Sequence, residues 1–288
     1  MTSALAEGAI THTIDVAGTS VEYIDSVGAG DGRTPIVLVH GTGATPQSHF
    51  GYIFPMLATR GRVIAIKLAD PMSHHEGGHP LEIAQFVEQV SAVLTASMGT
   101  QPAALVGYSL GAVIAAATAA AHPNQIQSLT LVSGWALTDN QQLLRNDVWR
   151  ELRALGSDKL KEFTVFCAFG GPFLASKLRS DLQPAIDAVV VDAFTEAQMD
   201  LNRDIDIRAE LEAITAPTLV VAGIHDQMVP VRHQKYLFGA IEDCRYTEIA
   251  SGHAVVFERP AELIRVIEAF TTAPHAHAAG TVIPTLKP

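Results

Sequence analysis

The sequence predicts an α/β protein built on a mostly parallel sheet, and three kinds of observation support this prediction. Short apolar runs rich in β-branched residues recur along the chain, which is typical of strands buried on both faces of a parallel sheet. Helical patterns, such as that of residues 81–98, lie between most of these runs. One strand-like run also leads through a Gly-x-Ser-x-Gly motif directly into a segment of helix-forming residues, 112–121.

The predicted elements follow one another in a regular order. Residues 11–25 alternate in polarity around a Gly-Thr pair, which predicts an opening antiparallel hairpin. Helices are expected between most of the later strands, and a last one is expected at residues 261–270. The later strands themselves are expected at residues 36–39, 63–67, 103–106, 129–132, 218–222 and 245–249.

One long segment interrupts this alternation. Between residues 132 and 218 no strand pattern appears, and that distance is too long for an ordinary connection between a helix and a strand. We therefore expect a helical cap at residues 134–208, inserted into a core formed by residues 1–133 and 209–271. Residues 272–288 lack periodicity, which predicts a flexible tail. Helical patterns within the cap cover residues 140–155, 160–169 and 182–194.

Composition narrows the classes of function. Of the 288 residues, 48% are hydrophobic and 17% charged, so the chain can bury a large core. The net charge of −11 argues against nucleic-acid binding, because phosphates require Lys and Arg. Cys167 and Cys244 are too few for a disulfide framework or a cysteine-based metal site. Without a secretory signal or a membrane-length apolar run, we expect a cytoplasmic protein that acts on a small molecule and needs no membrane.

The motif Gly107-Tyr108-Ser109-Leu110-Gly111 holds a serine at a sharp turn between a strand and a helix. A Cβ at either glycine would collide with the neighbouring strand or helix, which explains why glycine is needed there. Alone, the motif is also compatible with a Gly-rich turn that carries an incidental serine. Its weight depends on partners elsewhere in the chain.

Such partners occur, each directly after a strand-like run. His40-Gly41-Thr42-Gly43 is a glycine-rich turn that can direct backbone N–H groups toward a developing oxyanion. Asp226 and His253 follow the last two strand-like runs. The nucleophile, the acid and the histidine therefore occur in the chain order Ser109, Asp226, His253.

In these motifs the chain resembles the α/β-hydrolase superfamily, in particular members with a serine nucleophile and a helical cap. The resemblance extends from about residue 18 to about residue 270 and implies helices on both faces of the sheet. It implies that Ser109 is the nucleophile, that His253 is its base and later the acid, and that Asp226 orients His253. It also implies an oxyanion hole formed by the backbone N–H groups of Thr42 and Leu110.

Other residues compete for these roles. Asp206 and Asp243 are rivals of Asp226, which we prefer because it follows a buried strand in the expected position. His225 is expected to be a structural loop residue. His40 is expected to brace the oxyanion loop by hydrogen bonding rather than to exchange protons with substrate.

The segment from residue 67 to residue 80 departs from the family pattern. Ordinary members resemble Asp-x-x-Gly-x-Gly-x-Ser where this chain has Lys67-Leu68-Ala69-Asp70-Pro71-Met72-Ser73, which indicates an unusual pocket wall. His74-His75-Glu76 and His79 could form a metal site. Their spacing matches no metal motif, and the flanking prolines and glycines predict an irregular loop, so we expect neither a metal nor a cofactor.

The substrate pocket is expected where the cap meets the core, lined by Tyr108, Trp135, Phe166, Phe169 and Met228. No cluster of Arg or Lys stands out there, so we expect an uncharged, mostly apolar substrate. The sequence thus predicts a serine hydrolase that cleaves a carboxylic ester, thioester or lactone through an acyl-enzyme. Two alternatives remain open, a non-hydrolytic enzyme (lyase, cyclase or acyltransferase) and a non-catalytic ligand-binding module. The oligomeric state is not predicted.

Overall fold

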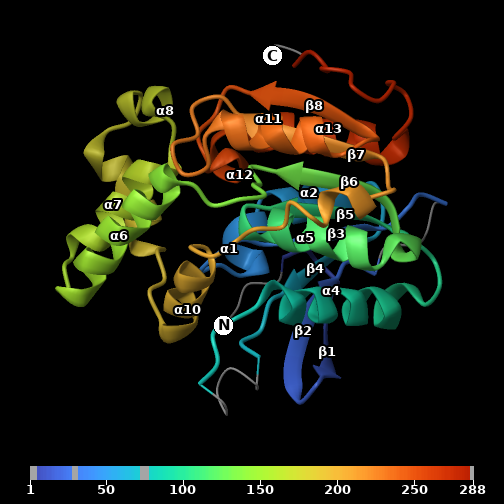
Figure 1. The fold of residues 1–288 in the computed structure, drawn as a ribbon, viewed down its shortest axis with the longest axis horizontal. Coiled ribbons are helices and arrows are strands. Elements are labelled where there is room, and N and C mark those ends of the chain that lie inside the picture. The colour runs from blue at the N-terminus through green and yellow to red at the C-terminus, as the bar shows by residue number, and fades with distance from the viewer. Residues whose placement is uncertain (1–4, 28–31, 72–77, 286–288) are drawn as a thin grey trace.

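A computed structural model describes residues 5–27, 32–71 and 78–285. Within these ranges an eight-stranded sheet has the strand order β1-β2-β4-β3-β5-β6-β7-β8 (Figure 1). β1 pairs with β2, and β2 with β4, in antiparallel fashion, whereas all later neighbours are parallel, as predicted. The strands are β1 (Ile10–Val16), β2 (Thr19–Asp25), β3 (Ile36–Val39), β4 (Val63–Lys67), β5 (Ala103–Tyr108), β6 (Ile126–Val132), β7 (Thr218–Gly223) and β8 (Cys244–Ile249).

Helices cover both faces of the sheet, as expected. Side chains alternate between the faces along each strand, so that in β3 Val37 and Val39 join one buried cluster and Leu38 joins the other. One face is covered by α4 (Ile83–Met98), α5 (Leu110–Ala121) and α11 (Val231–Ala240). The other face is covered by α1 (Pro46–Phe50), α2 (Ile53–Ala58), α12 (Val255–Glu258) and α13 (Pro260–Thr272).

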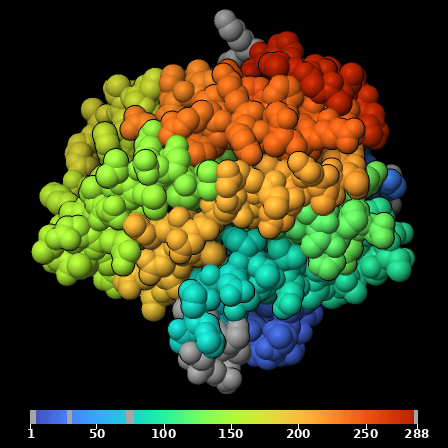
Figure 2. Space-filling view, viewed as in Figure 1, coloured from blue at the N-terminus to red at the C-terminus, as the bar shows by residue number. Residues whose placement is uncertain are grey.

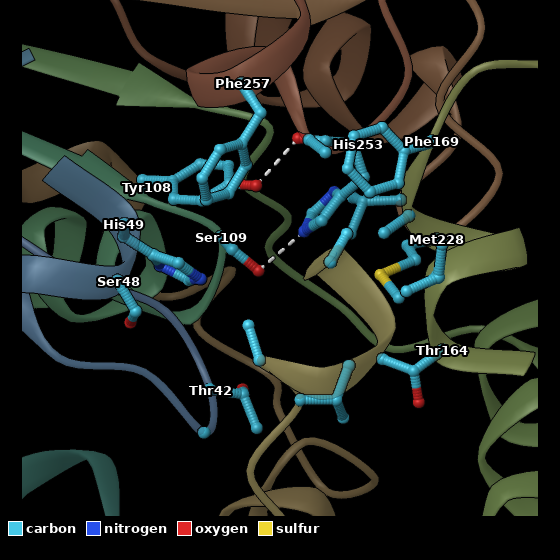
Figure 3. A pocket seen from close by; sticks show the side chains of 18 of the residues that line it. Thr42, Ser48, His49, Tyr108, Ser109, Thr164, Phe169, Met228, His253 and Phe257 are labelled. Atoms are coloured by element: carbon cyan, nitrogen blue, oxygen red, sulfur yellow. Dashed lines mark hydrogen bonds between the residues drawn. The ribbon is translucent and has the colours of Figure 1, made fainter. Parts of the chain in front are cut away.

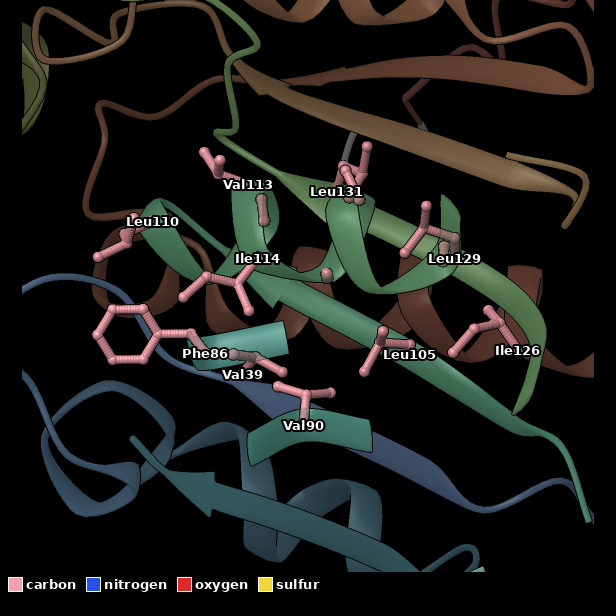
Figure 4. Close-up of a cluster of buried hydrophobic side chains, with 14 of the residues drawn as sticks. Val39, Phe86, Val90, Leu105, Leu110, Val113, Ile114, Ile126, Leu129 and Leu131 are labelled. Carbon is pink, nitrogen blue, oxygen red and sulfur yellow. The ribbon is translucent and has the colours of Figure 1, made fainter. Parts of the chain in front are cut away.

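Helix α5 is buried around almost its whole circumference, which explains its run of alanine and β-branched residues. Figure 4 shows its side chains between the sheet and α4, where Leu110 and Ile114 lie near Phe86. This tight packing holds the first turn of α5 against the ends of β3 and β5. The N-terminus of α5 is therefore a rigid base for the residue that precedes it, Ser109.

The segment between β6 and β7 is helical, and Figure 1 shows it beside the carboxyl ends of the parallel strands. In Figure 2 its first helices, coloured yellow-green, make up one end of the molecule. We call this segment the helical insertion; its boundaries at residues 134 and 208 stay predictions. Its helices are α6 (Asn140–Ala154), α7 (Lys159–Ala168), α8 (Gly171–Ala175), α9 (Gln183–Asp187) and α10 (Ala193–Leu201).

The helix expected at residues 182–194 is wrong in its extent. Helix α9 ends at Asp187, and a new helix, α10, begins after Asp192, whose carboxylate accepts hydrogen bonds from the Thr195 N–H and hydroxyl. Three consecutive valines precede Asp192, and β-branched residues followed by a capping residue favour a break over a continuous helix.

The end of the chain also differs from the expected flexible tail. After α13, the chain returns along β8, where the Tyr246 N–H donates to Thr281 O and the Ile283 N–H donates to Tyr246 O. Arg245 adds a side-chain hydrogen bond to His277 O. Backbone groups at the open edge of β8 need partners, and this segment supplies them without any periodicity of its own.

Candidate active site

Ser109 lies on a strained turn between β5 and α5. Its φ of +58° lies in the left-handed region, which a non-glycine residue adopts only when the surroundings impose it. A Cβ at Gly107 would lie 2.2 Å from Gly111 O, and one at Gly111 would lie 2.1 Å from Val39 O. The steric need for both glycines is thereby confirmed.

The three residues predicted to cooperate form one hydrogen-bonded chain. His253 Nε2 lies 2.8 Å from Ser109 Oγ, a contact drawn in Figure 3, and His253 Nδ1 lies 2.8 Å from Asp226 Oδ2. A carboxylate only accepts, so Nδ1 carries the proton and Nε2 is free to accept from the serine hydroxyl. This arrangement can remove a proton from Ser109.

Asp226 is held in place by its own loop. Its Oδ1 accepts the N–H groups of Met228 at 2.9 Å and of Val229 at 2.8 Å, which leaves Oδ2 for His253. The rival carboxylates lie elsewhere: Asp206 is exposed and paired with Arg208, and Asp243 is paired with Arg245 at the start of β8. Neither is bonded to His253.

The turn after β3 packs directly against the serine. A Cβ at Gly41 would lie 2.8 Å from Ser109 Cβ. The Gly41 N–H donates to His49 Nδ1 and the Gly43 N–H donates to Gln198 Oε1, at 3.2 and 2.8 Å. Among the described residues no acceptor is found for the N–H groups of Thr42 and Leu110, the pair predicted to bind an oxyanion.

His40 braces this turn from below. It is fully buried, its Nε2 accepts the Leu68 N–H at 3.1 Å, and its Nδ1 therefore donates to Gly41 O at 2.9 Å. Burial lowers the pKa of His40 to about 4, so the ring is neutral at physiological pH. The geometry matches the bracing role expected for it.

The loop that carries His253 is fixed by two further side chains. Tyr108, predicted as a pocket residue, donates its hydroxyl to His253 O at 2.8 Å. Burial, with the charges of Asp226 and Glu258, raises the pKa of Tyr108 well above its ordinary value, so it stays a donor. Glu258 accepts the Gly252 N–H at 3.1 Å and the Gly170 N–H at 2.9 Å, which ties the histidine loop to the helical insertion.

A cavity of about 710 Å³ lies above Ser109, between the helical insertion and the edge of the sheet formed by the carboxyl ends of its parallel strands. We call this edge, with Ser109, Asp226, His253 and the turn after β3, the sheet edge. Tyr108, Trp135, Phe169 and Met228, four of the residues expected in the substrate pocket, line the cavity, and its role as that pocket stays a prediction. Phe166 does not: it is 57% exposed, and its neighbour Val165 faces the cavity instead. Successive residues of a helix point about 100° apart, so placing Phe166 in the pocket was an error of helix phase.

Polar side chains also line the cavity, and the sequence analysis did not identify them. Helix α6 presents Gln142, Arg145, Asn146 and Trp149 to it. These positions follow the i, i+3, i+4, i+7 spacing of one helix face, a signal that was available in the sequence. The cavity is therefore less uniformly apolar than expected, and the guanidinium groups of Arg145 and Arg203 line it.

His49 is a further residue that the sequence analysis did not identify. It lies in α1, lines the cavity and contacts the ring of Tyr108 edge-on at 4.9 Å between centroids. Burial, with His40 and His253 nearby, lowers the pKa of His49 well below its ordinary value. Because its Nδ1 accepts from Gly41, the neutral ring carries its proton on Nε2.

His74, His75 and Glu76, the centre of the possible metal site, lie outside the described residues. Elsewhere in the described chain, no group of three or more His, Cys, Asp or Glu side chains is arranged to hold a metal ion. Within the same ranges every helix is too short or too polar to span a bilayer.

Comparisons with known proteins identify the family of the chain. The chain is 28% identical over 264 residues to the pyrrolizixenacetamide deacetylase of Xenorhabdus hominickii, covering 90% of this chain and 97% of that protein. It is 24% identical over 258 residues to a pimeloyl-[acyl-carrier protein] methyl ester esterase of Chromobacterium violaceum, covering 85% and 96%. The crystal structure of an α/β-hydrolase enzyme from a Medee basin deep-sea metagenome library superposes with a TM-score of 0.77, at 18% identity, over 90% of this chain and 96% of that one. The model of the alpha/beta hydrolase family matches residues 36–266, and the chain therefore belongs to that family.

Proposed function

We propose that the protein is a serine hydrolase that cleaves a carboxylic ester, thioester or lactone through an acyl-enzyme. The observation that carries the proposal is the Ser109, His253 and Asp226 chain at the floor of the cavity, with contacts of 2.8 Å. The named relatives, a deacetylase and a methyl ester esterase, support hydrolysis of an acyl group. The deacetylase also makes an amide a substrate type to test beside the ester.

In the proposed first half-reaction, Ser109 Oγ attacks the carbonyl carbon while His253 Nε2 takes its proton. Asp226 stabilises the imidazolium that forms, and its own loop keeps it in position. The Thr42 and Leu110 N–H groups donate to the oxyanion, a contact typically worth about 3 kcal/mol for each donor. His253 then returns the proton to the leaving alcohol or thiol, which leaves an acyl group on Ser109.

In the second half-reaction water takes the place of the alcohol. His253 removes a proton from the water as it attacks the acyl carbon, and Ser109 leaves with that proton. Trp135, Phe169 and Met228 provide the apolar walls for the mostly apolar part of the substrate. A lyase, cyclase or acyltransferase would use the same serine and histidine but would not pass the acyl group to water.

Labelling with a fluorophosphonate tests the nucleophile, because the probe reacts with an activated serine. We expect the wild-type protein to be labelled and to hydrolyse p-nitrophenyl butyrate, and Ser109→Ala to do neither. Labelling without hydrolysis of p-nitrophenyl or thioester substrates would favour a non-hydrolytic enzyme. Absence of labelling in both proteins would contradict the proposed nucleophile.

A further inference from the structure

Arg145 is a charged residue that lines the cavity. It lies on α6, on the face that also presents Gln142 and Trp149 to the cavity. Its Nε is shielded from solvent, and no hydrogen-bond partner for it is found among the described residues. In the same part of the chain no carboxylate forms an ion pair with it.

The other arginines of α6 are paired. Arg150 contacts Asp200 at 3.7 Å, and Arg153 contacts Glu196, both at the surface between α6 and α10. Asp139, the N-cap of α6, and Asp147, within that helix, are paired with Arg232 and Arg203, respectively. Of the three arginines of α6, the one without such an ion pair among the described residues is therefore the one that lines the cavity.

Two further cationic side chains line the cavity, and each has a partner. Arg203 donates to Asp147 at 2.6 Å and to Asn146 Oδ1 at 3.3 Å. Lys177 is exposed, and its Nζ lies 4.8 Å from the ring centroid of Phe173. Among the described cations that line the cavity, Arg145 is thus the one whose charge is available to a bound ligand.

Asp226 does not satisfy Arg145. Both of its carboxylate oxygens are engaged, Oδ1 with two backbone N–H groups and Oδ2 with His253. Burial lowers the pKa of Arg145, while Cys167 and Asp226 act in the opposite direction. A guanidinium stays charged in proteins, and keeping its Nε away from water without a partner destabilises the free protein.

We propose that the substrate carries a carboxylate, remote from the bond that is cleaved, which binds Arg145. This proposal rests on the proposed hydrolase function and replaces the expected uncharged substrate by an anionic one with an apolar middle. The apolar walls of Trp135, Phe169 and Met228 would hold that middle part, with the carbonyl at Ser109 and the carboxylate at α6.

Charge and shape favour a carboxylate over other acceptors. A guanidinium binds a carboxylate through two parallel N–H···O contacts, and the buried Nε offers one of these donors. The single positive charge of Arg145 balances one negative charge, whereas a phosphate dianion would leave an excess charge among apolar walls. A neutral carbonyl would accept one hydrogen bond but would leave the charge uncompensated.

The kinetic test compares two series of methyl esters by methanol release. One series contains monomethyl esters of dicarboxylic acids from succinic to suberic acid, and the other contains methyl esters of straight-chain monocarboxylic acids of matched length. We expect the wild type to prefer one length of the anionic series. In Arg145→Met this preference, measured as a ratio of kcat/KM values, should fall by roughly 10- to 100-fold, the range for a hydrogen bond to a charged group. The preference of Arg145→Lys should lie between those of the wild type and Arg145→Met, because lysine keeps the charge but lacks the planar pair of donors.

Arg150→Met is the matched control, since it removes a charge from the same helix at an exposed position. It should keep the wild-type preference. An equal loss on both ester series in Arg145→Met, or a wild type without any preference for the anionic series, would overturn the proposal while leaving the hydrolase function intact.

A binding measurement separates this proposal from the hydrolase function. In Ser109→Ala, which should not turn the ester over, the preferred monomethyl dicarboxylate should raise Tm. The Ser109→Ala, Arg145→Met double variant should show no such increase, although its own Tm without ligand should be at least as high. An equal increase in both proteins would overturn the role of Arg145, even if Ser109 proved not to be a nucleophile.

Discussion

The two walls of the cavity differ in how completely their polar groups are hydrogen-bonded. At the sheet edge, Asp226, His253 and His40 each use their acceptors and donors on neighbouring protein groups. In the helical insertion, Arg145 Nε and Asn202 Oδ1 are shielded from solvent and have no partner among the described residues. At the sheet edge these side chains are therefore satisfied without a ligand and the Thr42 and Leu110 N–H groups are left open, whereas in the helical insertion a charged side chain lacks a partner within the described residues.

This difference separates two tasks of a binding site. Groups that stabilise charge in a transition state work best when the protein already holds them in place, because no reorganisation is then needed during the reaction. Groups that recognise a substrate can remain unsatisfied until the substrate arrives, at a cost to stability of the free protein. We therefore expect substitutions in the two walls to separate turnover from substrate choice.

The largest expected effect comes from Asp226→Asn. The asparagine oxygen can still accept the Met228 and Val229 N–H groups, so the loop should stay folded. Its amide would face Nδ1 of His253 and favour the tautomer with the proton on Nε2, which cannot accept from Ser109. We expect kcat to fall by about 10⁴-fold with little change in Tm. Retention of a tenth of the wild-type activity would show that another group orients His253.

Acid should lower the free energy of unfolding through the buried histidines at the sheet edge. The unfolded chain takes up a proton at His40 near pH 6.5, whereas the folded protein does so only near the pKa of about 4. Between these values the unfolded state binds more protons, so the free energy of unfolding falls as pH falls. His40 alone should lower the free energy of unfolding by about 2 kcal/mol between pH 7.5 and pH 5.

Urea unfolding at these two pH values measures the effect. His40→Gln should show a smaller loss between them, whatever its absolute stability, and His49→Gln provides a second test because its shift has the same direction. Asp25 and Asp139, whose pKa values are lowered, lose their contribution only below about pH 4. A pH dependence in His40→Gln equal to that of the wild type would contradict a neutral, buried His40.

Sequence patterns were most informative in the core. The strands at residues 36–39 and 63–67 were predicted with their observed bounds, because buried parallel strands leave continuous apolar runs. Ser109, Asp226 and His253 could be placed because each follows such a run, and the carboxyl ends of parallel strands meet at one edge of the sheet. Local pattern and global geometry agree there.

In the helical insertion the same reasoning was weaker. Whether a helical residue faces the cavity depends on helix phase, and an error of one position put Phe166 into the pocket in place of Val165. Arg145 has no ion pair among the described residues because of the way carboxylates and arginines pair in three dimensions around α6. Sequence spacing does not predict such pairs. The position of the segment after α13 likewise depends on the open edge of β8, with which it pairs, rather than on a pattern in the segment itself.

The smallest expected effect concerns Gln198, the residue of α10 that joins the two walls. Its Oε1 accepts the Gly43 N–H beside the proposed oxyanion donor Thr42, and Asn202 Nδ2 donates to Thr42 Oγ1 one turn further on. Gln198→Met keeps the side-chain length but removes the acceptor, so the turn should lose its fixed orientation.

We expect kcat to fall about tenfold in Gln198→Met while KM changes little, because an oxyanion contact is made only in the transition state. Gln183→Met, at an exposed position of α9, is the control and should match the wild type. A lower Tm with unchanged kcat would show that Gln198 only supports packing. A fall in kcat at a temperature where the variant is fully folded would show instead that the helical insertion positions the reaction machinery, and the separation between the two walls would then be incomplete at this one residue.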